Sequence, residues 1–87
     1  MNEIFIITGC SKGIGDSLVN KLISKNNYVI GLSRTKIKSR KNFNHVVHDF
    51  KKNNSSKLAS KLFQLIRKLK KKPKKINIII NAGINIK

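Results

Sequence analysis

The sequence is poor in the residues that mark several common classes of small protein. It has one cysteine, so no disulfide can form within the chain, and the disulfide-stapled organisation of many small secreted domains is excluded. No apolar run approaches the ~20 residues that a membrane-spanning helix needs. Glu3 stands close behind Met1, where a signal peptide would carry a basic region. We therefore expect a cytoplasmic protein without a membrane partner.

Acidic residues are scarce as well. Three Asp and Glu stand against 20 Lys and Arg, which gives a formal net charge of +17. Such an imbalance favours contact with polyanions. The excess is nearly all lysine, and only residues 34–41 and 67–75 concentrate it. Neither cluster carries a recognition-helix pattern, zinc-ligand spacing or an aromatic RNA-binding motif. We expect non-specific attraction to polyanions and no specific nucleic-acid partner.

Candidate metal ligands and nucleophiles are few. His45 and His48 lie three residues apart in a predicted strand, where side chains alternate between faces, so we do not expect their imidazoles to share a metal. Cys10 lacks the histidine partner that would activate its thiol, and we interpret it as a small turn residue. The sequence therefore predicts no metal site and no catalytic residue within the chain.

The most informative stretch is a glycine-rich turn between a strand-like run and a helix-like pattern. Residues 4–7 are continuously apolar, as in a strand buried on both faces. From Ile14 onward, apolar residues recur at helical spacing, and we expect the asparagines at 26 and 27 to end this helix, since asparagine tolerates the left-handed conformation there. The turn between them contains Gly9, Gly13 and Gly15. Glycines let backbone approach a ligand closely, and the free N–H groups at a helix start attract an anion. The turn therefore predicts a pyrophosphate site.

Beyond this turn the chain alternates predicted strands and helices. Further strands are expected at residues 28–33, 43–48 and 76–80, and a second helix between Ser55 and Pro73. Parallel strands joined by helices build a doubly wound sheet, here with the order 3-2-1-4. The predicted fold class is α/β, the N-terminal portion of a Rossmann sheet with about four strands and two to three helices. We treat residues 1–87 as one partial domain of this fold.

The glycine turn carries a family resemblance. Residues 8–15 read Thr-Gly-Cys-Ser-Lys-Gly-Ile-Gly, which resembles the Thr-Gly-x-x-x-Gly-x-Gly turn of the short-chain dehydrogenase/reductase family. Residues 81–83, Asn-Ala-Gly, resemble the family's Asn-Asn-Ala-Gly after its fourth strand, with Ile80 in place of the first asparagine. The resemblance extends over the whole chain. Together with the chemistry of the strand ends it predicts these cofactor-binding residues: Thr8, Gly9, Ser11, Lys12, Gly13, Ile14, Gly15, Ser33, Arg34, Asp49, Phe50, Asn81, Ala82 and Gly83.

The end of the second predicted strand favours NADP(H) over NAD(H). An acid at this place would accept the ribose 2′-hydroxyl of NAD, but the chain has Ser33 and Arg34. A guanidinium pairs with a 2′-phosphate through two hydrogen bonds. The resemblance implies that Lys12 contacts the same phosphate. The alternative is that Arg34 is a solvated loop cation in a lysine-rich chain.

Two further positions take their roles from the resemblance. In the family, an aspartate followed by an apolar residue closes the third strand and accepts a hydrogen bond from the adenine amino group. Asp49 and Phe50 match that pair, although an aspartate after a strand is also a common turn or cap residue. Ala82 and Gly83 are small enough for backbone to pass close to the cofactor ribose.

The family's catalytic residues have no counterpart in this sequence. They are a serine on the fifth strand and a Tyr-x-x-x-Lys pair, whereas Tyr28 is the only tyrosine and Leu32 stands four residues after it. The resemblance implies a parent activity of hydride transfer between nicotinamide and a carbonyl or hydroxyl substrate. We expect a truncated, NADP(H)-binding segment that meets a small-molecule substrate only in a full-length form. The alternatives are a small basic nucleotide- or polyanion-binding protein and a non-functional gene fragment.

A sheet truncated after its fourth strand would have an apolar edge. Residues 76–80 hold four isoleucines, the composition that natural edge strands avoid. We therefore expect self-association through this strand, and higher solubility when Ile79 is replaced by lysine.

Overall fold

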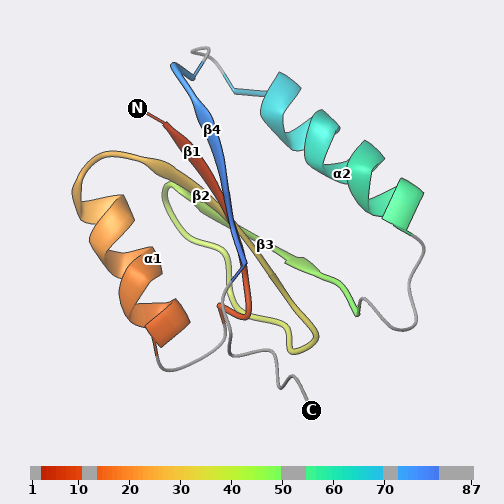
Figure 1. The fold of residues 1–87 in the computed structure, drawn as a ribbon, viewed down its shortest axis with the longest axis horizontal. Coiled ribbons are helices and arrows are strands. Elements are labelled where there is room, and N and C mark those ends of the chain that lie inside the picture. The colour runs from red at the N-terminus through yellow and green to blue at the C-terminus, as the bar shows by residue number, and fades with distance from the viewer. Residues whose placement is uncertain (1–2, 11–13, 50–54, 70–72, 81–87) are drawn as a thin grey trace.

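The computed structural model describes residues 3–10, 14–49, 55–69 and 73–80. The elements in chain order are β1 (Ile4–Thr8), α1 (Ile14–Ser24), β2 (Tyr28–Ser33), β3 (Phe43–Val47), α2 (Ser55–Arg67) and β4 (Ile76–Ile79). All strand pairs are parallel and the strand order is β3-β2-β1-β4 (Figure 1). The predicted α/β class and strand order are confirmed.

The two helices cover opposite faces of the sheet, as Figure 1 shows. Side chains alternate between faces along a strand, so Ile4 and Ile6 meet α2 while Phe5 and Ile7 meet α1. The central strands β1 and β2 are therefore apolar at nearly every position, as the sequence predicted for strands buried on both sides. Neither helix in the described ranges is long and apolar enough to cross a membrane.

Asparagine ends α1 as the sequence predicted. Asn26 adopts the left-handed conformation with φ 64°. Its N–H donates to the carbonyl of Ile23 at 2.9 Å, and the N–H of Asn27 donates to the carbonyl of Leu22 at 3.2 Å. This pair of bonds is the Schellman motif, which satisfies carbonyls that the last turn of a helix leaves without partners. The Nδ2 of Asn27 adds a second bond to Leu22 O at 3.2 Å, so the exit toward β2 is held firmly.

Four predicted boundaries were wrong, the first being the end of β1, which includes Thr8 beyond the predicted residues 4–7. The second helix ends at Arg67 and not at Pro73, while β3 ends at Val47 and β4 at Ile79, one residue earlier than predicted in each case. Lysines follow Arg67 closely in the sequence, and like charges three or four residues apart destabilise a helix. The N–H of Leu69 donates to Ile66 O at 3.2 Å, an i to i−3 bond that tightens the helix end.

Strand β4 lies at one edge of the described sheet and pairs with β1. Its side chains on the α2 face are exposed: Ile76 is 48% and Ile78 is 69% accessible. Ile79 points to the other face, where it packs against the cluster beneath α1. The predicted choice of Ile79 for a solubilising lysine was therefore wrong, because the alternation along β4 makes Ile78 the exposed position.

Candidate functional site

The carboxyl ends of the parallel strands meet at one edge of the sheet. The pairing register places Thr8 beside Leu32 and Leu32 beside Val46, so these residues form one row across β1, β2 and β3. The chain moves outward from β1 to β2 and β3, and then returns to the opposite side of β1 to form β4. This reversal between β1 and β4 is a topological switch point, the place where open α/β sheets bind ligands.

Gly9 makes the turn at the end of β1. It has φ 63°, a left-handed conformation that residues with a Cβ rarely adopt. Its N–H donates to the carbonyl of Leu32 at 3.0 Å, so the β1–β2 ladder continues one residue past Thr8, which is buried. The predicted glycine turn therefore leaves the sheet at its carboxyl edge, beside the switch point.

The turn leads into α1, whose first residue is Ile14. Gly15 in the first turn is buried, and Asp16 beside it is the acidic residue near the helix start. The first N–H groups of a helix have no partners within it and attract negative charge. The predicted residues Ser11, Lys12 and Gly13 lie outside the described residues. What the structure describes of the turn is the left-handed Gly9, Cys10 and the start of α1.

Cys10 lies beneath the turn and belongs to the core. Its side chain is 1% exposed, and its Sγ lies 3.8 Å from the carbonyl oxygen of Leu32. Burial raises the pKa of the Cys10 thiol. The interpretation of Cys10 as a small turn residue was incomplete. Free cysteine is one of the most buried residue types, and that preference was the available signal.

The hydroxyl of Ser33, the last residue of β2, is hydrogen-bonded to two other residues. Its hydroxyl donates to the carbonyl of Thr35 at 2.8 Å, which closes a tight turn around Arg34. The same oxygen lies 2.6 Å from Nε2 of His45 on β3. Arg34 is exposed at the tip of this turn. The structure thus places the predicted Ser33 and Arg34 at the carboxyl edge, next to the strand that carries the glycine turn.

His45 is the residue of this region that sequence reasoning missed, since we considered it only as a metal ligand. Besides Ser33, its Nδ1 accepts a hydrogen bond from the N–H of Ile37 at 3.3 Å. The backbone N–H of His45 donates to the hydroxyl of Ser39 at 3.0 Å. Burial, and next the charge of Lys36, lower the pKa of His45. The pairing of Gly31 with His45 across β2 and β3 brings the imidazole close to Ser33. No local sequence pattern predicts this pairing.

Asp49 lies two residues past β3 at the same edge of the sheet. The N–H of His48 donates to Ser33 O at 3.0 Å, which extends the β2–β3 pairing up to Asp49. Asp49 is half-buried. The other predicted positions at this edge, Phe50 after β3 and residues 81–83 after β4, lie outside the described residues.

No family model matches the chain, and no curated protein matches it. Among solved structures, the chain is similar to the crystal structure of a short chain dehydrogenase family protein from Francisella tularensis subsp. tularensis SCHU S4. The two share 28% sequence identity with a TM-score of 0.65, over the whole of this chain and 34% of that one. The chain resembles a short-chain dehydrogenase. The family resemblance predicted from the glycine turn is confirmed, and the chain spans about a third of that protein's length.

Tyr28, the single tyrosine of the sequence, lies away from the carboxyl edge of the sheet. Tyr28 is the first residue of β2, at the end of the strand opposite to Ser33. It is buried, and its hydroxyl accepts a hydrogen bond from Nδ2 of Asn44. The side chain therefore packs at the amino edge of the sheet, away from the edge that carries Gly9 and Arg34.

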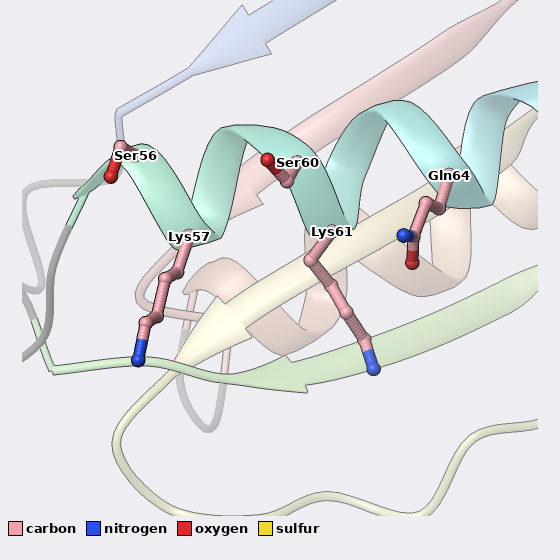
Figure 2. A pocket seen from close by; sticks show the side chains of 5 residues that line it. All are labelled: Ser56, Lys57, Ser60, Lys61 and Gln64. Carbon is pink, nitrogen blue, oxygen red and sulfur yellow. The ribbon is translucent and has the colours of Figure 1, made fainter.

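A concave surface lies away from the carboxyl edge of the sheet. It is a shallow, open hollow of about 300 Å³ on the outside of α2. Figure 2 shows its lining residues, with the side chains of Lys57 and Lys61 extending in the same direction from the helix. The full lining is Ser56, Lys57, Ser60, Lys61 and Gln64. All of these belong to one helix, and none is a predicted cofactor-binding residue.

Proposed function

We propose that residues 1–87 are a partial NAD(P)-binding Rossmann domain of a short-chain dehydrogenase-like protein, and that the nucleotide bound is NADP(H). The observation that carries the proposal is the left-handed Gly9 turn at the switch point, with α1 starting behind it. A dinucleotide pyrophosphate requires close backbone approach and unpaired helix N–H groups at this place. The described residues fit that requirement.

Each predicted site residue has an assigned part of the cofactor in this proposal. The strand ends run in the order β3, β2, β1, β4, so adenine, ribose, pyrophosphate and nicotinamide ribose are assigned along the same edge. The adenine is assigned to Asp49 and Phe50, and the 2′-phosphate to Ser33, Arg34 and Lys12. The pyrophosphate falls to Thr8, Gly9, Ser11, Gly13, Ile14 and Gly15, and the nicotinamide ribose to Asn81, Ala82 and Gly83.

The preference for NADP(H) rests on the turn after β2. No carboxylate occurs among residues 33–42, so nothing in this loop accepts the ribose 2′-hydroxyl as an acid would. Arg34 is exposed at the tip of the turn that the Ser33 hydroxyl closes. A guanidinium in this position suits bidentate contact with a 2′-phosphate.

The parent reaction follows from the similarity to a short chain dehydrogenase family protein. When bound, NADPH would donate a hydride to a carbonyl carbon, and NADP⁺ would accept one from a hydroxyl-bearing carbon. Such a transfer also needs a positioned proton donor. The sequence has no Tyr-x-x-x-Lys pair, and Tyr28 lies at the wrong edge. We assign the acid–base residues and the small-molecule pocket to chain outside residues 1–87, and the protein to the cytoplasm, where the free Cys10 stays reduced.

Titration of NADPH and NADH against the purified chain tests the proposal. We expect NADPH to bind at least about tenfold more tightly, since the 2′-phosphate contributes charge-assisted hydrogen bonds. Arg34→Asp should remove that preference. The control is Lys38→Asp, an exposed charge reversal in the same loop. Equal affinity of the unmodified chain for both nucleotides would overturn the NADP(H) assignment, and binding of neither would overturn the nucleotide site.

A polyanion-binding role is the second candidate, and a specific observation favours it. Lys57 and Lys61 are four residues apart on one flank of α2 and line the hollow of Figure 2. Lys68 follows seven residues later, directly after the last residue of the helix. All three are exposed, and no Asp or Glu follows Asp49 in the sequence. A lysine stripe of this kind neutralises backbone phosphates without reading bases.

Salt-dependent binding of a fluorescein-labelled poly(dT) strand separates this role from bulk charge. Neutralising Lys57, Lys61 and Lys68 with glutamine should reduce the slope of log affinity against log salt by about 2, for three lost phosphate contacts. The matched control neutralises Lys21, Lys38 and Lys41, which are exposed elsewhere on the described chain. Equal slopes for the two triple variants would mean that net charge alone attracts the strand, and that α2 is no binding surface.

A further inference from the structure

We propose that His45 is a positioning residue for the cofactor site, holding the turn that presents Arg34 and thereby setting selectivity for a ribose 2′-phosphate. The inference rests on the proposed NADP(H) function and adds a residue that the family resemblance does not supply. His45 lies on β3, whereas Arg34 follows β2, and two hydrogen bonds through Ser33 connect His45 to Thr35, the residue after Arg34.

The hydrogen bonds around the imidazole agree on one arrangement of protons. The Ser33 hydroxyl donates its single proton to Thr35 O at 2.8 Å, so its oxygen accepts from His45 Nε2–H at 2.6 Å. A neutral ring protonated at Nε2 has an acceptor at Nδ1, which meets the N–H of Ile37 at 3.3 Å. The neutral imidazole therefore satisfies both neighbours, and it fixes the direction of a hydroxyl that otherwise rotates freely.

The hydrogen bonds of His45 and Ser33 hold residues 33–39, the first part of the loop between β2 and β3. Ser33 and Thr35 flank Arg34, and Ile37 follows shortly after, so the imidazole bonds to residues on either side of the arginine. The backbone N–H of His45 also binds the Ser39 hydroxyl at 3.0 Å. A side chain at the tip of a turn is positioned only as well as the turn itself, and loss of geometry at a charged contact lowers affinity.

The far half of the loop is anchored independently of the imidazole. Arg40 and Phe43 exchange two backbone hydrogen bonds, each 2.9 Å long. The Arg40 guanidinium also donates to Asn20 Oδ1 on α1 at 2.6 Å and lies 4.8 Å from the centre of the Phe43 ring. Removing the His45 ring should therefore loosen the turn at Arg34 without releasing the whole loop or β3.

Protonation of His45 would disturb the same contacts. A proton on Nδ1 turns the acceptor for Ile37 N–H into a donor, so two donors would face each other. Lys36 in the same loop is the charged group whose field acts on the ring, and it opposes protonation. The uncharged neighbours are the Ser33 and Ser39 hydroxyls and the Phe43 ring, whose centre lies 6.4 Å away. Selectivity for the 2′-phosphate should therefore weaken as His45 takes up a proton.

The test uses two probes that differ only at the ribose, adenosine 2′,5′-bisphosphate and adenosine 5′-monophosphate. Calorimetry gives the affinity ratio for the unmodified chain, His45→Ala, His45→Gln and the loop control Lys38→Ala. We expect His45→Ala to lower the ratio about tenfold, as for loss of a well-placed charged contact. His45→Gln should retain much of the ratio, because its amide can still donate to the Ser33 oxygen. Lys38→Ala should leave it nearly unchanged.

Two further measurements distinguish positioning from general stability. Backbone amide spectra should show shifts at Arg34, Thr35 and Ile37 in His45→Ala, with the Asn20 and Arg40 signals unchanged. The affinity ratio of the unmodified chain should fall more steeply with decreasing pH than that of His45→Gln. The probe's own phosphate titrates near pH 6 in both experiments, so it cancels in this comparison.

The outcomes for the inference and for the proposed function differ. An unmodified chain that binds both probes equally, or neither, would refute the NADP(H) proposal itself. A preference for the bisphosphate that persists undiminished in His45→Ala would refute the positioning role alone. Should His45→Ala fail to fold, a His45→Gln variant with the same pH profile as the unmodified chain would refute it equally.

Discussion

A methyl group placed on Gly31 would lie 2.6 Å from the Sγ of Cys10, on the neighbouring strand's turn, and 2.8 Å from Cε1 of Phe43. These separations are shorter than van der Waals contact, and the three residues come from β2, the turn after β1, and β3. The absence of a side chain at Gly31 therefore lets the Cys10 thiol and the Phe43 ring fill one space beneath the glycine turn.

Gly31→Ala should destabilise the chain by about 1–3 kcal/mol, because interiors are too densely packed to accept another carbon without strain. Urea denaturation measures the change. Cys10→Ala creates room beside Gly31, so the double variant should be more stable than the sum of the single effects predicts. Strict additivity would show that Cys10 and Gly31 do not share this space.

The left-handed residue at the end of α1 offers a second test. Asn26→Ala should lower the free energy of unfolding by roughly 1 kcal/mol, because φ 64° is strained for a residue with an ordinary Cβ. Asn26→Gly should be neutral or stabilising, since glycine adopts this conformation without strain. Thermal or urea unfolding of both variants checks the prediction. An alanine variant as stable as the glycine variant would mean that the Schellman turn does not form in solution.

The His45 imidazole should make stability depend on pH. Its pKa in the folded chain is lowered, chiefly by burial and next by Lys36. Between that lowered value and the ordinary value near 6.5, the unfolded chain binds more protons than the folded one. The stabilising contribution of neutral His45 is therefore complete above about pH 6.5 and declines as pH falls toward the folded-state pKa.

Urea unfolding of the unmodified chain and of His45→Gln, between about pH 5 and pH 8, measures this dependence. Only in the unmodified chain does protonation of His45 contribute to the free energy of unfolding, whereas His48 is present in both proteins. The difference between the two pH profiles therefore isolates the contribution of His45. Parallel profiles would show that His45 titrates alike in the folded and unfolded states.

Strand β4 should mediate self-association. Its α2 face exposes Ile76 and Ile78, and an apolar strand at a sheet edge invites pairing with another strand. Ile78→Lys should keep the chain monomeric with little change in stability, because the side chain is 69% exposed. Ile79→Lys should instead destabilise the fold by at least about 1 kcal/mol, since it removes a core contact and buries a charge.

Sedimentation velocity over a range of concentrations, together with urea unfolding, separates the two isoleucine variants. An unmodified chain that sediments as a compact monomer at every concentration would show that β4 is not an association surface. Equal stability of Ile78→Lys and Ile79→Lys would contradict the assignment of the two residues to opposite faces of β4.

Local signals predicted most of the fold. The bounds of β2 were correct because an apolar run stands between two asparagines and a charged loop. The end of α1 was correct because Asn26 is one of the few residues that tolerate a left-handed conformation. The end of α2 was wrong because Pro73 marks only where a helix can no longer continue, and repulsion among lysines ends this one sooner.

The candidate site was predictable where one stretch of chain builds it. Gly9 turns where the sequence placed it, because a left-handed turn after a strand requires glycine almost regardless of surroundings. Ser33 and Arg34 lie at the predicted edge because parallel strands share that edge. Their roles toward a cofactor stay predictions. The link from Ser33 to His45 was not predictable, since it depends on which residue of β3 stands beside Gly31.

By itself, the sequence determined which segments become strands or helices, where the chain turns, and that its strands lie parallel. Those features follow from the period of apolar residues and from the backbone freedom of glycine and asparagine, both of which are local. Only the tertiary structure decided that Cys10 is core, that Ile78 rather than Ile79 is exposed, and that His45 is hydrogen-bonded to Ser33. Each of these depends on the register between strands distant in sequence, and a shift of one residue would turn every side chain to the opposite face.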